Sequence, residues 1–252
     1  MLARLIPEPG RDVYGETAPS GQYRLKFMSD ETTPPGDWAD LAEQRLLDAA
    51  IPLAATLGWN PGLITAAARE AGLGAGEAQL VLPNGARDLA ALFSHRHDQA
   101  AMTALEAVDP SALKIRARIS QGAQARLDAA AANLEATRRC AAFLALPPNI
   151  PLGLRLAWDS ADTLWRWAGD TATDENHYSK RAILAGILIS TLAVRLSAGP
   201  EAASAQLAAR IESVMAFEKW KAARKPGTFG RDLAERLGQL RYGRAKSETP
   251  VP

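Results

Sequence analysis

Apolar residues recur every three or four positions along most of this 252-residue chain, and this spacing constrains the fold more than any other feature. One example is the set Leu47, Ala50, Ile51, Ala54 and Leu57. The period matches the 3.6-residue turn of an α-helix, and no segment alternates polar and apolar side chains for long enough to form a strand. We therefore predict an all-α fold.

Clusters of glycine and proline divide the chain into the predicted helices. They fall at 58–61, 72–76, 83–85, 109–110, 147–151, 169–173, 199–200 and 226–230. These breaks leave three short helices, long helices at about 111–146, 151–168, 174–197 and 201–224, and a last short helix from about residue 229. The helix at 174–197 is apolar around most of its circumference, which indicates burial on several sides.

Composition restricts the function classes. The formal net charge is only +1, so no global field attracts nucleic acid. The single cysteine, Cys140, excludes an intrachain disulfide and suits a reducing compartment. No run of about 18 uninterrupted apolar residues is present, so we expect no membrane-spanning helix.

The first 36 residues are rich in proline and glycine and lack helical periodicity, which predicts a flexible leader. Five acidic residues argue against a mitochondrial transit peptide: Glu8, Asp12, Glu16, Asp30 and Glu31. No apolar signal-peptide core is present either. We expect a cytoplasmic protein.

Residues 46–93 resemble the N-terminal helix-turn-helix domain of TetR-type regulators without a gap. The matching residues are Leu47, Asp48, Ala49, Ala50, Gly58, Trp59, Ala68, Arg69, Glu70, Ala71 and Gly72. The resemblance implies a TetR-like build with a longer helical ligand-binding domain behind it, and a homodimer formed through C-terminal helices.

The element that would read DNA departs from that pattern. The segment 75–81 carries Glu77, which has the wrong sign for phosphate, and no Lys or Arg lies between Glu70 and Asn84. We expect a retained fold that binds no nucleic acid. The alternative is a ligand-responsive TetR-like transcription regulator with an unusual reader helix.

A second motif, at 159–196, resembles the Coq-nine family of ubiquinone-biosynthesis accessory proteins. It comprises Asp162, Trp165, Ala168, Gly169, Asp170, Thr173, Asp174, Tyr178, Lys180, Arg181, Ser190 and Thr191. Pro147 and Asn149 fit the proline-rich joint of that family, and the likeness extends from about Leu46 to Ile211. One residue differs: His177 stands where the family has Trp.

The Coq-nine resemblance implies a function without catalysis. The chain would bind a polyprenyl quinone intermediate and present it to the di-iron demethoxyubiquinone hydroxylase. The candidate lipid-binding residues are Leu154, Ile187, Leu188 and Thr191. The candidate partner-binding residues are Trp165, Asp170, His177, Tyr178 and Arg181. A structural alternative exists for part of the motif, since Thr173 or Asp174 can cap a helix.

Residues for catalysis are not apparent in the sequence. His95 and His97 are two positions apart, so on a helix they point in different directions and cannot chelate one metal. Cys140 lies between arginines and alanines and is more typical of a buried structural cysteine. We expect no catalytic residue, no metal and no cofactor.

The last predicted helix is amphipathic. Its apolar stripe consists of Phe229, Leu233, Leu237 and Leu240, flanked by Arg231, Arg236, Arg241 and Arg244. The pattern fits an interfacial membrane helix or a helix docked on its own domain equally well. The Coq-nine resemblance favours the membrane, and hence a peripheral protein on the inner face of a bacterial membrane.

The predicted organisation has five parts. They are a leader (1–36), a helix-turn-helix-like domain (37–93), a lipid-binding and dimerisation domain (94–225), a membrane-binding helix (226–244) and a disordered tail (245–252).

Overall fold

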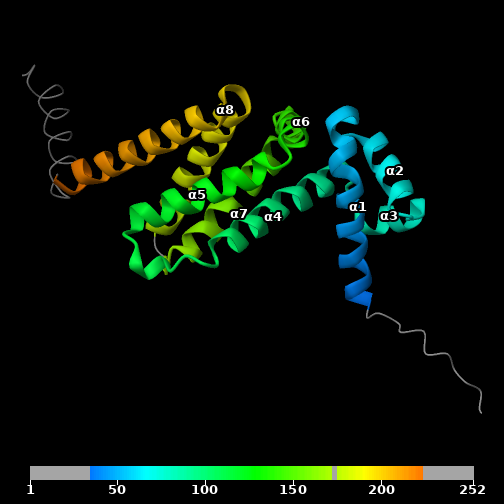
Figure 1. Cartoon of the computed structure of the whole chain (residues 1–252), viewed down its shortest axis with the longest axis horizontal. Coiled ribbons are helices and arrows are strands. Elements are labelled where there is room, and N and C mark those ends of the chain that lie inside the picture. Colours follow the sequence, from blue (N-terminus) through cyan, green and yellow to red (C-terminus); the bar gives the residue numbers. More distant parts are fainter. Residues whose placement is uncertain (1–34, 172–174, 224–252) are drawn as a thin grey trace, which may run out of the picture. The chain divides into compact units, whose positions relative to one another are not determined.

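The computed structural model describes residues 35–171 and 175–223, shown in colour in Figure 1. The chain divides into two units, Met1–Trp38 and Ala39–Pro252, and apart from the start of α1 every described helix belongs to the second. The predicted leader before Pro35, the capping residues Thr173 and Asp174, the helix at 226–244 and the tail lie outside the described residues.

The described residues form helices and no strands, which confirms the all-α prediction. The α-helices are α1 (Pro35–Leu57), α2 (Pro61–Glu70), α3 (Ala75–Val81), α4 (Ala86–Leu105), α5 (Ile115–Ala131), α6 (Leu134–Leu144), α7 (Ile150–Trp167) and α8 (Glu175–Ala223). Two short 3₁₀ helices, η1 (Pro110–Ala112) and η2 (Pro147–Asn149), connect them. The predicted boundary between residues 93 and 94 falls inside α4, and the division into two domains there stays a prediction.

Local chemistry explains the helix-turn-helix segment. The Asn60 side chain accepts a hydrogen bond from the Leu63 amide (3.1 Å) and caps α2, and Pro61 occupies the first helical position. Glu77 accepts a hydrogen bond from the Gly74 amide (2.7 Å) at the start of α3. The acid that opposes DNA binding therefore has a structural role in starting its helix.

The single helix predicted at 111–146 is wrong, because the chain forms η1, α5 and α6 over this range. Asn133 leaves the helical conformation (φ −122°, ψ 62°) between α5 and α6. The buried Thr137 hydroxyl donates a 2.6 Å hydrogen bond to the Ala130 carbonyl. A side chain thus satisfies a backbone group near the end of α5, and no glycine or proline marks the break.

The main core lies where α4, α5, α7 and α8 pack together (Figure 1). Its largest buried side chains are Leu105, Ile119, Leu127, Leu164, Leu184, Ile187, Leu188, Leu207 and Ile211. Gly199 (φ 90°, ψ −176°) breaks α8, because this positive-φ conformation, which glycine adopts readily, cannot continue a right-handed helix. The predicted break at 199–200 is confirmed, and α8 consists of two helical parts.

Among the described residues, the segment His177–Val214 of α8 is long and apolar enough to cross a membrane. The bent pair Leu134–Leu144 and Pro147–Trp167 passes the same test as a unit. Leu184, Leu188 and Leu207 of α8 are buried in the core, which accounts for part of this apolar composition. Length and composition alone therefore do not exclude a span, contrary to our expectation.

Candidate functional site

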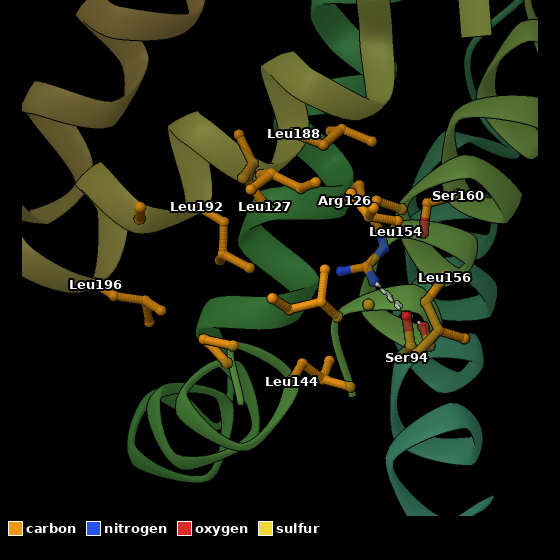
Figure 2. Close-up of a pocket in the computed structure, with 17 residues that line it drawn as sticks. Ser94, Arg126, Leu127, Leu144, Leu154, Leu156, Ser160, Leu188, Leu192 and Leu196 are labelled. Carbon is orange, nitrogen blue, oxygen red and sulfur yellow. Dashed lines mark hydrogen bonds between the residues drawn. The ribbon is translucent and has the colours of Figure 1, made fainter. Parts of the chain in front are cut away.

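A cavity of about 590 Å³ lies between α4, α5, α6, α7 and α8 (Figure 2). Its wall is almost entirely apolar and consists of Leu127, Ala141, Leu144, Ala145, Ile150, Gly153, Leu154, Leu156, Ala157, Leu188, Ile189, Leu192, Ala193 and Leu196. Pockets of this size and character hold small organic molecules or parts of lipids.

Three polar residues also line the cavity: Ser94 from α4, Arg126 from α5 and Ser160 from α7. The Arg126 Nε donates a 2.5 Å hydrogen bond to Oδ1 of Asp98, and one terminal nitrogen donates to the Ser94 hydroxyl at 3.1 Å. The Ser160 hydroxyl donates to the same Asp98 oxygen at 2.6 Å. Figure 2 shows the other terminal nitrogen of Arg126 pointing away from Ser94, towards the apolar side chains.

The Arg126–Asp98 pair is buried, with side-chain exposures of 12% and 11%. A buried charge requires a partner, and here the two charges cancel. The cavity therefore offers a hydrogen-bond donor without a net charge. This combination suits an oxygen atom of a neutral ligand, because an anion would meet the Asp98 carboxylate close behind the guanidinium.

The structure places two of the four predicted lipid-binding residues, Leu154 and Leu188, in the cavity wall. Ile187 and Thr191 do not line the cavity and are buried, with 7% and 0% exposure. They lie one helical turn apart on a different stripe of α8 from Leu188. Since α8 is apolar on most sides, the sequence could not show which stripe faces the cavity.

Sequence reasoning also missed Asp98 and Arg126. Each is a charged residue in an amphipathic helix, which usually indicates a solvated position. The sequence offered little indication that these residues are buried. In the structure both Asp98 and the adjacent His97 are buried in α4. Pairing them with Arg126 needed the packing of α4 on α5.

Two buried side chains of types that often carry chemistry, His97 and Cys140, are held in neutral forms. Burial, aided by the charges of Arg126 and Arg96, lowers the pKa of His97 to about 3. Burial raises the pKa of the Cys140 thiol to about 12, and the structure confirms that Cys140 is buried. Within the described ranges, no group of three or more His, Cys, Asp or Glu side chains could hold a metal ion.

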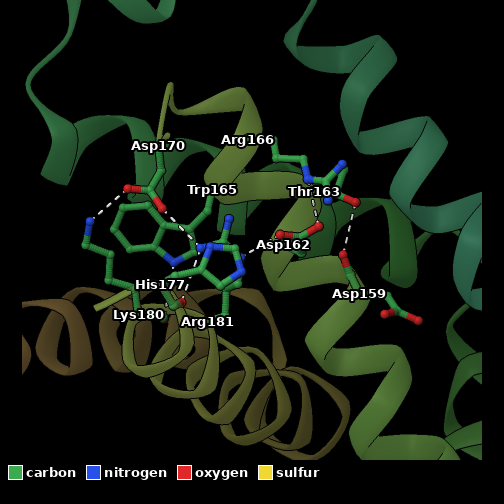
Figure 3. Close-up of polar contacts among 9 residues, drawn as sticks. All are labelled: Asp159, Asp162, Thr163, Trp165, Arg166, Asp170, His177, Lys180 and Arg181. Carbon is green, nitrogen blue, oxygen red and sulfur yellow. Dashed lines mark hydrogen bonds and ion pairs between the residues drawn. The ribbon is translucent and has the colours of Figure 1, made fainter. Parts of the chain in front are cut away.

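A second polar cluster joins α7 to the start of α8 (Figure 3). The Arg181 Nε donates to Asp162 at 2.5 Å, and its Nη1 donates to Asp170 at 3.0 Å. Lys180 Nζ donates to the other Asp170 oxygen at 2.8 Å and lies 5.3 Å from the Trp165 ring centroid. We call these five residues the α7–α8 clamp.

Gly169 allows this clamp to form. With φ 85° it ends α7, and the Asp170 amide then donates to the Trp165 carbonyl at 3.0 Å. The tight turn leaves the Asp170 carboxylate facing Lys180 and Arg181. Burial would raise the pKa of Asp170, but hydrogen bonds from Lys180 and Arg181 and their charges outweigh burial and lower it.

The five predicted partner-binding residues lie together, in two layers. Arg181, at 2% exposure, and Asp170 are buried in the clamp, so they support the surface from beneath and do not provide contact area. Tyr178 is 64% exposed, and its ring lies 6.1 Å from Trp158 and 5.1 Å from His177, centroid to centroid. Arg181 also donates to the His177 carbonyl at 3.2 Å, which anchors the first turn of α8 under Tyr178.

Comparison with known proteins identifies related sequences. A COQ9 family model matches residues 150–218. The chain is 27% identical over 193 residues to the ubiquinone biosynthesis protein COQ9, mitochondrial, of Rattus norvegicus, covering 73% of this chain and 58% of that protein. It is 30% identical over 165 residues to COQ9-B of Xenopus laevis, covering 61% and 55%. A segment of 53 residues is 45% identical to COQ9 of Homo sapiens, covering 21% and 17%.

The chain spans about half the length of the curated relatives that it matches over most of its own length. The region matched by the family model begins with α7 and includes most of α8. It therefore contains two walls of the cavity and the whole α7–α8 clamp.

Proposed function

We propose that the chain acts in ubiquinone biosynthesis by holding a polyprenyl quinone intermediate in the cavity, and the COQ9 family model that matches residues 150–218 and the similar COQ9 proteins support this proposal. In this proposal the chain does no chemistry itself and presents the bound quinone to the demethoxyubiquinone hydroxylase. The observation that carries it is the apolar cavity of about 590 Å³ with the Arg126 guanidinium in its wall, whose charge is balanced by Asp98. Apolar walls suit an isoprenoid chain, and the Arg126 guanidinium suits a quinone or phenol oxygen.

Attachment to a membrane surface and homodimer formation are further parts of the proposal. Both rest on the family and TetR resemblances, because residues 226–244 lie outside the described residues. The surface around Tyr178 supports presentation to a partner, since α7 and α8 form both the cavity wall and the aromatic cluster.

A short-chain ubiquinone analogue should stabilise the chain against heat. At 100 times its dissociation constant, a ligand that binds only the folded state contributes about 2.7 kcal/mol. For a domain of this size, that corresponds to a melting temperature higher by roughly 5–10 °C. Differential scanning calorimetry with and without the analogue tests the proposal. A melting temperature that does not move at saturating analogue would refute quinone binding.

Removing the donor should weaken quinone binding without removing the cavity. We expect Arg126→Met with Asp98→Asn to weaken affinity about 10- to 100-fold, because a hydrogen bond from a charged donor contributes about 1.5–3 kcal/mol. The double variant avoids leaving Asp98 as an unpaired buried charge. Isothermal titration with the analogue measures the loss. Arg139→Met, at an exposed position, is the control and should bind like wild type.

The exposed ring of Tyr178 should contribute to hydroxylase binding. Truncation of an aromatic anchor commonly costs 2 kcal/mol or more, so Tyr178→Ala should weaken association at least about 30-fold. Tyr178→Phe keeps the ring packed between Trp158 and His177 and should retain most of the affinity. Surface plasmon resonance with immobilised hydroxylase provides the comparison. Equal affinity for all three proteins would assign the docking surface elsewhere.

A further inference from the structure

The corner between α6 and α7 carries an uninterrupted segment without charged side chains. Between Arg139 and Arg155 the sequence contains no Asp, Glu, Lys, Arg or His. Within it, Leu146, Ile150 and Leu154 are 52%, 45% and 57% exposed. Single exposed apolar residues are ordinary, but several together on an uncharged corner indicate a surface that contacts something apolar. We call residues 146–154 the portal corner.

The portal corner is continuous with the cavity. Ile150 and Leu154 line the cavity and are also exposed, so they lie at its mouth. Leu144 and Ala145, just before the corner, line the cavity as well. A lipid that passes between these side chains moves directly between the cavity and whatever covers the corner.

Backbone chemistry holds the corner in shape. Asn149 is buried, and its side-chain amide donates to the Phe143 carbonyl at 3.0 Å. The Asn149 and Ile150 amides both donate to the Leu146 carbonyl, at 2.8 and 3.1 Å. The polar side-chain amide of Asn149 is therefore turned inward and away from water. The side chains of Leu146, Ile150 and Leu154 are the exposed ones. A bend of 95° between α6 and the segment from Pro147 places these side chains at an apex.

Basic residues border the apex. Arg138, Arg139 and Arg155 have side-chain exposures of 47%, 51% and 78%. Arg138 and Arg139 share Glu135 as a partner, and Arg155 lies 3.8 Å from Asp159. The three arginines and their two acidic partners, Glu135 and Asp159, together have a net charge of +1 beside the uncharged apex. Basic residues around exposed aliphatic side chains match the surface of a bilayer that contains anionic lipid.

We propose that the portal corner inserts its apolar side chains into the bilayer surface, so that the mouth of the cavity opens onto lipid. This inference rests on the proposed function, because it supplies the route by which a quinone intermediate would reach the cavity. It assigns membrane contact to described residues of the helical body, in addition to the helix that the sequence predicts at 226–244. Exchange of lipid then needs no passage of the isoprenoid chain through water.

A fluorescent probe at the apex tests the corner directly in the full chain. Leu146→Cys can be labelled selectively, since the native Cys140 is buried and its thiol is protonated. An environment-sensitive fluorophore at this cysteine should shift its emission to shorter wavelength when phosphatidylcholine–phosphatidylglycerol vesicles are added. Lipids brominated on their acyl chains should quench it. A probe at Glu106→Cys, about 18 Å along α4 from Ser94, is the control and should not respond.

A second variant measures the contribution of the corner to binding. Leu146→Glu with Ile150→Glu should reduce co-sedimentation with the same vesicles about ten-fold or more. Two aliphatic side chains that would be partly buried in the bilayer then become carboxylates. Both positions are exposed, so the fold should be kept. Leu233→Glu with Leu237→Glu, in the helix that the sequence predicts at 226–244, measures the contribution of that segment to vesicle binding separately from the contribution of the portal corner.

Three outcomes would overturn the inference. The apex probe could stay unresponsive while the protein sediments with vesicles. The probe could already be shielded without vesicles, which would show that another segment or a second copy covers the corner. The protein could fail to bind vesicles at all. Failure of the proposed function is distinguishable, since a quinone analogue would then leave the melting temperature unchanged whatever the probe reports.

Discussion

Replacing Arg181 by methionine should lower the free energy of unfolding by about 3–5 kcal/mol. Arg181 is 2% exposed and is the partner of both Asp162, at 2.5 Å, and Asp170, at 3.0 Å. Its loss removes a cation that pairs with the buried Asp170 carboxylate, and Lys180 stays paired with the other carboxylate oxygen. Urea denaturation followed by circular dichroism measures the change. The matched control is Arg166→Met, because Arg166 also pairs with Asp162 but is 74% exposed, and we expect a loss below about 1 kcal/mol.

The stability lost in Arg181→Met should depend on pH and should become smaller in acid. The folded-state pKa of Asp170 is lowered, so its contribution is fully present above the unfolded pKa of about 3.9 and is lost as the pH falls through the folded value. The difference between wild type and Arg181→Met should therefore be constant near neutrality and narrow below about pH 4. A difference that grows on acidification would show that another group dominates.

Filling the cavity should abolish lipid binding while keeping the fold. Ala157 lines the cavity from α7 and packs against the main core. Ala157→Phe places a ring in space that an isoprenoid chain would occupy, so quinone affinity should fall more than 100-fold. Since filling an empty cavity commonly adds about 0.5–2 kcal/mol, the free protein should unfold at an equal or higher temperature.

Ala157→Phe is informative because quinone affinity should fall while thermal stability stays equal or rises. A variant that lost affinity because it misfolded would also lose thermal stability. Ala209→Phe, at an exposed position of α8, provides the matched control and should change neither quantity. Unchanged quinone affinity in a folded Ala157→Phe protein would place the ligand outside the cavity.

Much of the fold follows from local sequence signals. The 3.6-residue period predicts an all-α chain, and glycine or proline marks the breaks at Gly58, Gly72, Gly169 and Gly199, all of which have positive φ. The break at Asn133 could not be predicted in this way. It depends on the Thr137 hydroxyl reaching the Ala130 carbonyl, a contact that requires α6 to turn back against α5.

The candidate site was less predictable, for a physical reason. Leu154 and Leu188 were assigned from the apolar helix together with the Coq-nine resemblance, but a helix that is apolar on most sides, such as α8, does not reveal which stripe faces a cavity. Asp98 and Arg126 are 28 positions apart, and only the packing of α4 on α5 brings them together. The signature residues Asp162, Asp170 and Arg181 were found by resemblance, and the structure adds that they form ion pairs and that the side chains of Asp170 and Arg181 are buried.

The central claim is that the cavity holds a neutral isoprenoid lipid, and mass spectrometry of lipids retained by the native protein tests it most directly. The full chain, purified from membranes that make ubiquinone and without detergent, should carry a polyprenyl quinone or its precursor in near-stoichiometric amount. Ala157→Phe, prepared in parallel, should carry little. A wild-type protein with no isoprenoid lipid above the level in the Ala157→Phe preparation would contradict the account.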